Sequence, residues 1–430
     1  MSFYRLLIFL LFALTSLFAG CHSNGNGKAA ELKAPDPCAI ALAPQNHGES
    51  EEIDGEIARM QQAARKASDP TGFLEKIAWR YVEKARLSYD PGYYKIAEQC
   101  AACIESHKPQ STEAMLLRGH ILHNLHRFKE AEEISRTLVS RRGLAFDYGL
   151  LGDVLMEQGK LSEAIPAYQK MMDLKPSPQA YNRGAHVRWL KGDLDGARFL
   201  LQMAAQAAGQ GDPESSAWAY ARLSLLELQA GSFRKAASSC GASININRDY
   251  APGLLACGRV MMAEGRLSEA ISLFQRAAKL NPLPEYLWML ADVLRASQRE
   301  TEAREIEGQL ISRGETDDPR TLALFLATRG LEVNKALRLA ENEQKTRNDI
   351  YTFDAVAWAL AAVGRFDEAH GMIERALAEG TKDARLFFHA AVIAEKSQRL
   401  DEAHRLTRQA GALRQMLLPS EQERLRRLNL

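Results

Sequence analysis

The sequence has no excess of charge of either sign and no motif of enzyme chemistry. Lys and Arg number 55 and Asp and Glu 54, a net charge of +1, so composition gives no electrostatic reason to expect a nucleic-acid partner. It holds no glycine-rich phosphate loop, His-Glu-x-x-His motif or nucleophile elbow. His120 and His123 lie three residues apart, but no further metal ligand accompanies them. These absences predict a protein that is not an enzyme and that uses no cofactor or metal.

Apolar runs of bilayer length are also lacking. The run from Leu6 to Ala19 follows Arg5 and is shorter than the roughly 20 residues that span a membrane. It is typical of a secretory signal peptide, here residues 1–20. Its end, Leu-Phe-Ala-Gly-Cys, resembles the lipobox of bacterial lipoproteins and so implies lipidation of Cys21. In that family, an aspartate directly after the cysteine retains a lipoprotein at the inner membrane. This chain has His22 there, so the resemblance favours the outer membrane, facing the periplasm. Ordinary cleavage to a soluble periplasmic protein is the alternative.

An alanine recurs along most of the chain at steps of 33 or 34 residues, with one step of 39. The positions are Ala97, Ala131, Ala164, Ala197, Ala236, Ala270, Ala303, Ala336, Ala369 and Ala403. A period in the low thirties is typical of one helix pair that is repeated and stacked into a solenoid. The long step contains residues 208–213, where we expect a lengthened surface loop, because loop-closure entropy grows slowly with length.

Other residues recur in phase with these alanines. Gly152 and Gly258 stand where a first helix must closely approach a second helix, and prolines such as Pro176 follow the second helix. Glycines expected just past the first helix, where a left-handed conformation is needed, stand at positions 159, 192, 231, 265 and 364. Gln298, Gln398 and Leu331 replace that glycine in three repeats.

This combination resembles the tetratricopeptide repeat (TPR) family. The resemblance implies an all-α, right-handed α-solenoid of about ten helix pairs over residues 69–417. The chain before it divides into a flexible tether, residues 21–48, rich in Gly, Ser, Asn and Pro, and an amphipathic capping helix, residues 49–68. The charged residues 418–430 form a second cap, since the ends of a solenoid must present polar surfaces.

Six cysteines remain to be placed. Cys100 and Cys103 form a Cys-x-x-Cys within a continuous helix, where we expect small packing residues; thiol redox or metal chemistry is the alternative. Cys240 and Cys257 occupy core positions of adjacent helices and could form a disulfide in an oxidising compartment. Cys38 could pair with either Cys100 or Cys103.

In the TPR family the first helix of each pair lines a concave groove. Aligning the repeats predicts a ladder of basic and aromatic residues there, formed by Arg183, Arg222, Arg259, Arg295, Arg329, Trp189, Trp218, Trp288, Phe325 and Trp358. Such a ladder suits an acidic peptide or an acidic polysaccharide. The function predicted is therefore a membrane-anchored periplasmic scaffold that binds proteins, in envelope assembly, pilus or secretion biogenesis, or exopolysaccharide export. The competing hypothesis is a periplasmic thiol redox or metal-handling protein that uses Cys100 and Cys103.

Overall fold

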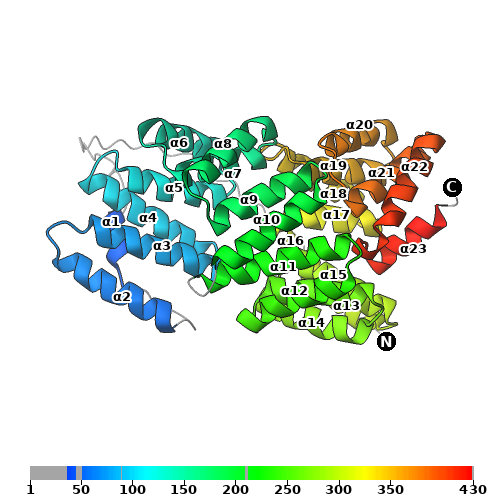
Figure 1. Ribbon diagram of the computed structural model, residues 1–430, viewed down its shortest axis with the longest axis horizontal. Coiled ribbons are helices and arrows are strands. Elements are labelled where there is room, and N and C mark those ends of the chain that lie inside the picture. Colours follow the sequence, from blue (N-terminus) through cyan, green and yellow to red (C-terminus); the bar gives the residue numbers. More distant parts are fainter. Residues whose placement is uncertain (1–35, 45–50, 89, 209–211, 429–430) are drawn as a thin grey trace, which may run out of the picture. The chain divides into compact units, whose positions relative to one another are not determined.

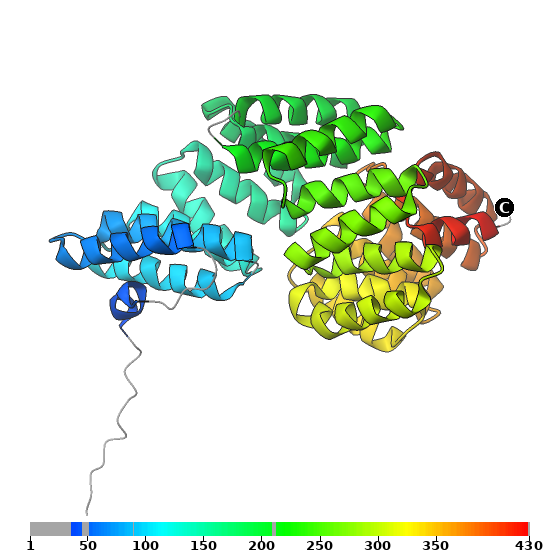
Figure 2. The ribbon, with the colours of Figure 1, turned by 90° about the horizontal axis from the view of Figure 1, so that it is seen from below.

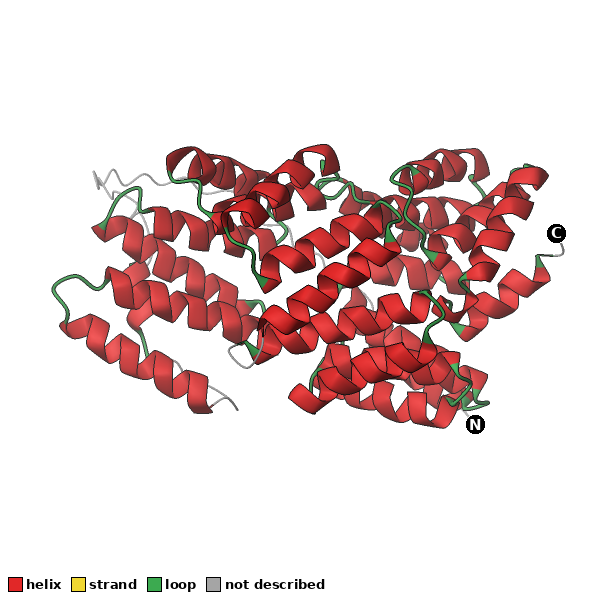
Figure 3. Cartoon of the chain, viewed as in Figure 1, coloured by secondary structure: helices red, strands yellow, loops and turns green. Residues whose placement is uncertain are grey.

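The computed structural model describes residues 36–44, 51–88, 90–208 and 212–428. Within these residues it contains 23 α-helices and no strand, as the helix and strand colours of Figure 3 make plain. The predicted all-α solenoid is confirmed. The signal peptide and Cys21 lie outside the described residues.

Ten helix pairs follow one another along the chain, and consecutive pairs stack side by side (Figure 1, Figure 2). They are α3 (Thr71–Ser88) with α4 (Gly92–His107), α5 (Thr112–Asn124) with α6 (Phe128–Arg141), α7 (Ala145–Glu157) with α8 (Leu161–Leu174), α9 (Pro178–Leu190) with α10 (Leu194–Ala208), α11 (Pro213–Gln229) with α12 (Phe233–Ile246), α13 (Ala251–Ala263) with α14 (Leu267–Leu280), α15 (Pro284–Ala296) with α16 (Glu300–Asp317), α17 (Pro319–Arg329) with α18 (Val333–Gln344), α19 (Ile350–Ala362) with α20 (Phe366–Leu377), and α21 (Ala384–Lys396) with α22 (Leu400–Ala412).

The recurring alanines explain how each pair closes. All ten lie in the second helix of a pair, and all are 0% exposed. The opposing small residue on the first helix is equally constrained, because a Cβ at Gly152 would lie 2.4 Å from the Tyr168 ring and one at Gly258 would lie 2.4 Å from Phe274. The period of the sequence is therefore the distance along the chain between the alanines at which the two helices of each pair approach closely.

From the second pair onward, the loop inside each pair contains a residue with positive φ. Gly159 and Gly265 supply it with φ of 72° and 78°, and Gln298 and Gln398 adopt the same conformation with φ of 62° and 59°. The assignment of Leu331 to this position was wrong by one residue. The chain there turns through Gly330 and Glu332, which have φ of 66° and 40°.

Two further helices precede the repeats. Helix α2 (Glu51–Lys66) lies where the capping helix was expected. The described part of the expected tether, however, contains helix α1 (Pro37–Leu42), which a Cys38–Cys103 disulfide joins to α4. Gln61 of α2 donates to the backbone oxygens of Ala41 and Ala43 at 3.0 and 3.1 Å. The expectation of a flexible tether was therefore wrong for residues 37–43, because the disulfide and these hydrogen bonds hold them on α4 and α2.

Repeats far apart in the sequence also touch. The Asn348 amide donates to the Glu157 carbonyl at 3.2 Å, and the Thr381 hydroxyl donates to the Leu190 carbonyl at 2.6 Å. The Gln415 side chain donates to the Gln229 carbonyl at 2.9 Å. The partners are separated by 191 residues in the first two contacts and by 186 in the third, which is between five and six repeats of the sequence period. The solenoid thus comes round on itself, and its second turn rests on its first.

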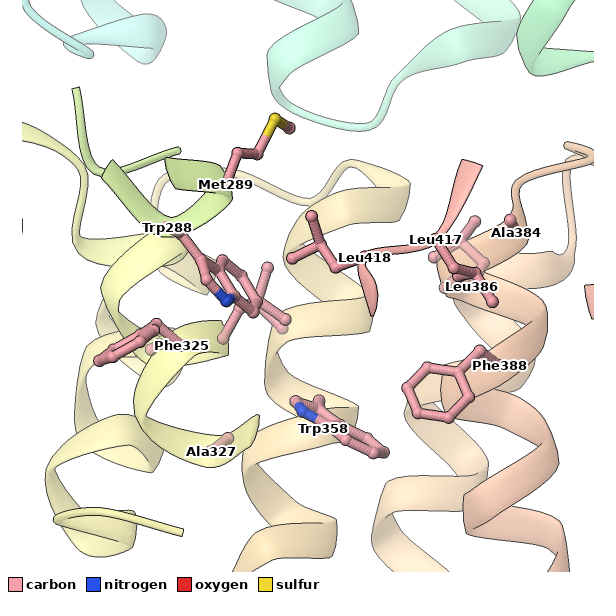
Figure 4. Close-up of a cluster of buried hydrophobic side chains, with 14 of the residues drawn as sticks. Trp288, Met289, Phe325, Ala327, Trp358, Ala384, Leu386, Phe388, Leu417 and Leu418 are labelled. Carbon is pink, nitrogen blue, oxygen red and sulfur yellow. The ribbon is translucent and has the colours of Figure 1, made fainter. Parts of the chain in front are cut away.

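The chain ends in a short 3₁₀ helix, η1 (Arg414–Met416), and helix α23 (Pro419–Arg427). Leu417 and Leu418 between them are 0% and 1% exposed. Figure 4 shows both leucines beside Trp288, Trp358 and Leu386, which come from first helices of three different repeats. The expected C-terminal cap is therefore inserted among the repeats. None of the helices in the described ranges has the length and apolarity to cross a membrane.

Candidate binding groove

The first helices α7, α9 and α11 line an open cavity of about 570 Å³. Its walls include charged groups from all three helices and aromatic rings from α9 and α11: Asp153, Arg183, His186, Trp189, Trp218 and Arg222. We call this cavity the open groove. It contains four of the ten residues of the predicted ladder, two arginines and two tryptophans.

Most charges in the open groove are already paired within the protein. Arg183 holds Asp153 through two bonds, of 2.8 and 2.5 Å, and the Tyr168 hydroxyl donates to the same carboxylate at 2.9 Å. Burial acts to raise the pKa of Asp153, but Arg183, His123 and the Tyr168 hydroxyl together keep that pKa below its usual value. Arg86 of α3 reaches Glu214 of α11 at 3.0 Å. Each of these pairs is electrically neutral, so none of them offers a charge to a ligand.

Arg222 is the exception. Among the described residues no carboxylate oxygen lies within ion-pair distance of its guanidinium, which instead lies 5.8 Å from the centre of the Trp218 ring. Burial and the neighbouring Arg222 charge lower the pKa of His186 to about 4, so this imidazole is neutral at pH 7. The groove therefore offers one uncompensated positive charge beside a flat apolar face.

Trp189 marks the inner end of the open groove. Its indole N–H donates to the Gln229 side chain at 2.8 Å, and its ring stacks on Tyr351 of the second solenoid turn with centroids 6.3 Å apart. Sequence reasoning did not identify Gln229 or Tyr351 as neighbours of this groove, because they come from other repeats and one of them from the other turn.

The groove continues into a second cavity of about 460 Å³, which we call the inner chamber. The two cavities share His186, Trp189 and Arg222. The inner chamber is further lined by ladder residues Arg259 and Trp288 and by Met416 and Leu418 of the C-terminal segment, among others. Arg259 donates to the Met416 carbonyl at 2.6 Å, so this arginine already has a partner from its own chain.

The other four ladder residues do not line either cavity. Arg295 and Arg329 both bind Glu307 of the second helix α16, at 2.7 and 3.3 Å. Phe325 is 0% exposed and Trp358 is 2% exposed. The continuous ladder was therefore wrong beyond Trp288. Neighbouring first helices and the C-terminal residues cover Phe325 and Trp358, and helix α16 pairs the two arginines.

The cysteines divide into two disulfides and one buried thiol within the described residues. Cys240 is bonded to Cys257, and Cys103 to Cys38. Cys100 is 0% exposed, and burial raises the pKa of its thiol to about 12. A protonated, inaccessible thiol is a poor nucleophile, and its Cys-x-x-Cys neighbour is bonded elsewhere. This arrangement gives no support to a redox role for Cys100 and Cys103.

Comparison with known proteins agrees with this geometry. A family model described as tetratricopeptide repeat matches residues 150–213, 255–317 and 356–409. A structure of the human IFIT1 dimer with m7Gppp-AAAA aligns at a TM-score of 0.51 and 13% identity, over 75% of this chain and 76% of that one. Pseudomonas aeruginosa pilF aligns at a TM-score of 0.40 and 16% identity, over 47% of this chain and 90% of that one. No curated protein sequence matches.

The family match covers the third and fourth, the sixth and seventh, and most of the last two helix pairs. The pairs between them have the same buried alanine and the same left-handed loop residue. The chain therefore contains tetratricopeptide repeats.

Proposed function

We propose that this protein is an adaptor anchored to a membrane by lipid on Cys21, and that its open groove binds an extended acidic segment of a partner protein in the periplasm. The observation that carries the proposal is Arg222, an unpaired cation beside Trp218 in an open cavity whose other charges are compensated. A carboxylate of the ligand would supply the missing partner, and its apolar side chains would cover the tryptophan faces.

The extracytoplasmic location has independent support. Two disulfides lie among the described residues, and such bonds persist in oxidising compartments. The apolar run before Cys21 resembles a lipoprotein signal. Within this compartment the proposed role is recruitment in envelope assembly, in pilus or secretion biogenesis, or in exopolysaccharide export.

The groove is tested with defined probes. A fluorescein-labelled ten-residue peptide of alternating Leu and Glu should bind the purified chain more tightly than its Leu-Lys counterpart, as measured by fluorescence anisotropy. Arg222→Glu should weaken the acidic peptide at least about tenfold, equivalent to roughly 1.4 kcal/mol. Arg338→Glu is the matched control, because it makes the same charge change at an exposed site of the second helix α18.

Two outcomes would contradict this proposal, the first for the site and the second for the ligand. Equal binding by wild type and Arg222→Glu would remove Arg222 from the site. Binding of an oligogalacturonate in place of either peptide, with loss in Arg222→Glu, would reassign the ligand to an acidic polysaccharide.

The anchor is tested separately. Cys21→Ser should release the protein from the membrane fraction, since only acyl chains are proposed to hold it there. Persistence of that variant in membranes after a high-salt wash would refute the lipid anchor without affecting the groove.

A further inference from the structure

The C-terminal segment lies among the first helices in the way that a bound peptide would. We define it as residues 413–428, which comprise η1, the Leu417–Leu418 pair and α23. Leu417 and Leu418 have extended backbones, with φ and ψ of −88° and 150° and of −66° and 155°. Their buried side chains enter the apolar cluster of Trp288 and Trp358 (Figure 4).

Polar groups of the repeats hold the segment at several points. Arg259 of α13 donates to the Met416 carbonyl at 2.6 Å. Asp292 of α15 accepts from the Ser420 amide at 3.0 Å and from its hydroxyl at 2.5 Å. Arg385 of α21 binds Glu421 at 2.7 Å. Each contact comes from a different first helix, so three separate repeats each bind one residue of the segment.

This chemistry differs from that of a simple end cap. Buried ion pairs such as Arg385–Glu421 contribute little net stability compared with apolar packing, but they discriminate strongly against the wrong partner. Glu421 is 1% exposed, and it also accepts from the Leu418 amide at 2.8 Å, which starts helix α23. The surface beneath the segment is thus selective for an acidic residue three positions after an aliphatic one.

The segment contains no helix of a repeat. It follows the second helix of the last pair and is joined to that helix through the exposed residue Ala412. Met416 and Leu418 also form part of the wall of the inner chamber. Its departure would therefore extend the open groove along the first helices of the later repeats.

We propose that residues 413–428 are a displaceable internal ligand covering a second protein-binding surface, formed by α13, α15, α19 and α21. The partner that replaces them is a protein segment of the same chemistry: two adjacent aliphatic residues in extended conformation, then a helix start with an acidic residue at its third position. This surface adjoins the open groove, but binding to it requires no charge on Arg222.

The test uses the full chain with a specific protease site inserted between Ala412 and Leu413. After folding and cleavage, size-exclusion chromatography at high dilution should separate the segment from the repeats. The remaining repeats should then bind a fluorescein-labelled peptide of residues 413–428, whereas the uncleaved chain should not. A peptide with Leu417→Asp and Leu418→Asp is the matched control and should not bind.

A charge exchange makes the assignment specific. Arg385→Glu in the cleaved protein should weaken the peptide at least about tenfold, and the peptide carrying Glu421→Arg should recover most of that loss. The proposal is overturned if the cleaved segment does not exchange with labelled peptide within a day. It is also overturned if wild-type and control peptides bind equally, or if circular dichroism shows that the repeats unfold when the segment leaves.

Discussion

Replacing Gly159 by alanine should separate the two turns of the solenoid. Gly159 lies in the loop between α7 and α8 with φ of 72°, and an added Cβ would lie 2.1 Å from the backbone oxygen of Asn348 in the other turn. Gly265 occupies the equivalent loop between α13 and α14 with φ of 78°, and its Cβ would meet nothing within 4 Å. Both substitutions place an alanine in a left-handed conformation, and they differ only in the contact between the added Cβ and Asn348.

The difference between them can be estimated from that contact. Each alanine costs about 1–2 kcal/mol for its left-handed backbone. In Gly159→Ala the Asn348 backbone must also retreat by about 1 Å, since contacts below 3.0 Å force a shift. This movement weakens the Asn348–Glu157 hydrogen bond of 3.2 Å and the Arg347–Glu157 ion pair of 2.9 Å. Those two interactions are worth about 1 kcal/mol or less each, so Gly159→Ala should cost roughly 1–2 kcal/mol more than Gly265→Ala.

Hydrogen exchange measures this locally, which suits a repeat protein whose unfolding need not be two-state. The Asn348 amide donates across the two turns, so its exchange should accelerate about tenfold or more in Gly159→Ala. In Gly265→Ala it should match wild type. Equal exchange at Asn348 in both variants would show that the turns do not rest on each other in solution.

Three further outcomes follow from buried groups. Burial lowers the pKa of His120 and His186 to about 4. Because the unfolded chain binds protons at these sites below about pH 6.5 and the folded chain does not, stability should fall between pH 6.5 and 4, by roughly 3 kcal/mol per histidine in pH-dependent melts. A pH-independent melting temperature over that range would contradict this. After denaturation without reductant, the protein with lipid on the Cys21 thiol should show one reactive thiol, Cys100. Reductant should raise the count of reactive thiols to five. Ala270→Leu should lower stability by about 1–3 kcal/mol, because the site is 0% exposed. Ala237→Leu should cost less, because Ala237 is half-buried and lies one residue after the equivalent alanine of its own repeat; equal melting temperatures would contradict the repeat register.

The repeat itself was predictable because its determinants are local. Ala270, Gly258 and Gly265 act within one helix pair, so their spacing in the sequence directly gives the register of the fold. The error at Leu331 has the same origin. Gly330 lies one residue earlier and takes the left-handed position, and a period alone does not reveal a shift of one residue.

The groove was predictable only in part because its lining depends on which face of a first helix is left uncovered. Arg222 lies in the middle of α11 and faces the cavity. Arg295 and Arg329 lie in the last turns of α15 and α17, within reach of Glu307 on the long helix α16. A basic residue on a first helix therefore predicts a groove position only when no acidic residue of an adjacent second helix can reach it.

Contacts between the two turns decide where a partner can bind. A solenoid whose repeats touch only their neighbours exposes its whole concave face. In this chain the loops that contain Asn348 and Thr381 contact the loops at Glu157 and Leu190, and the later first helices face the C-terminal segment. The open groove lies beside these contacts, because Glu157 and Trp189 line it, and the later first helices line the inner chamber. Because the same contacts stabilise the solenoid and border these cavities, loss of a contact between the turns should change binding as well as stability.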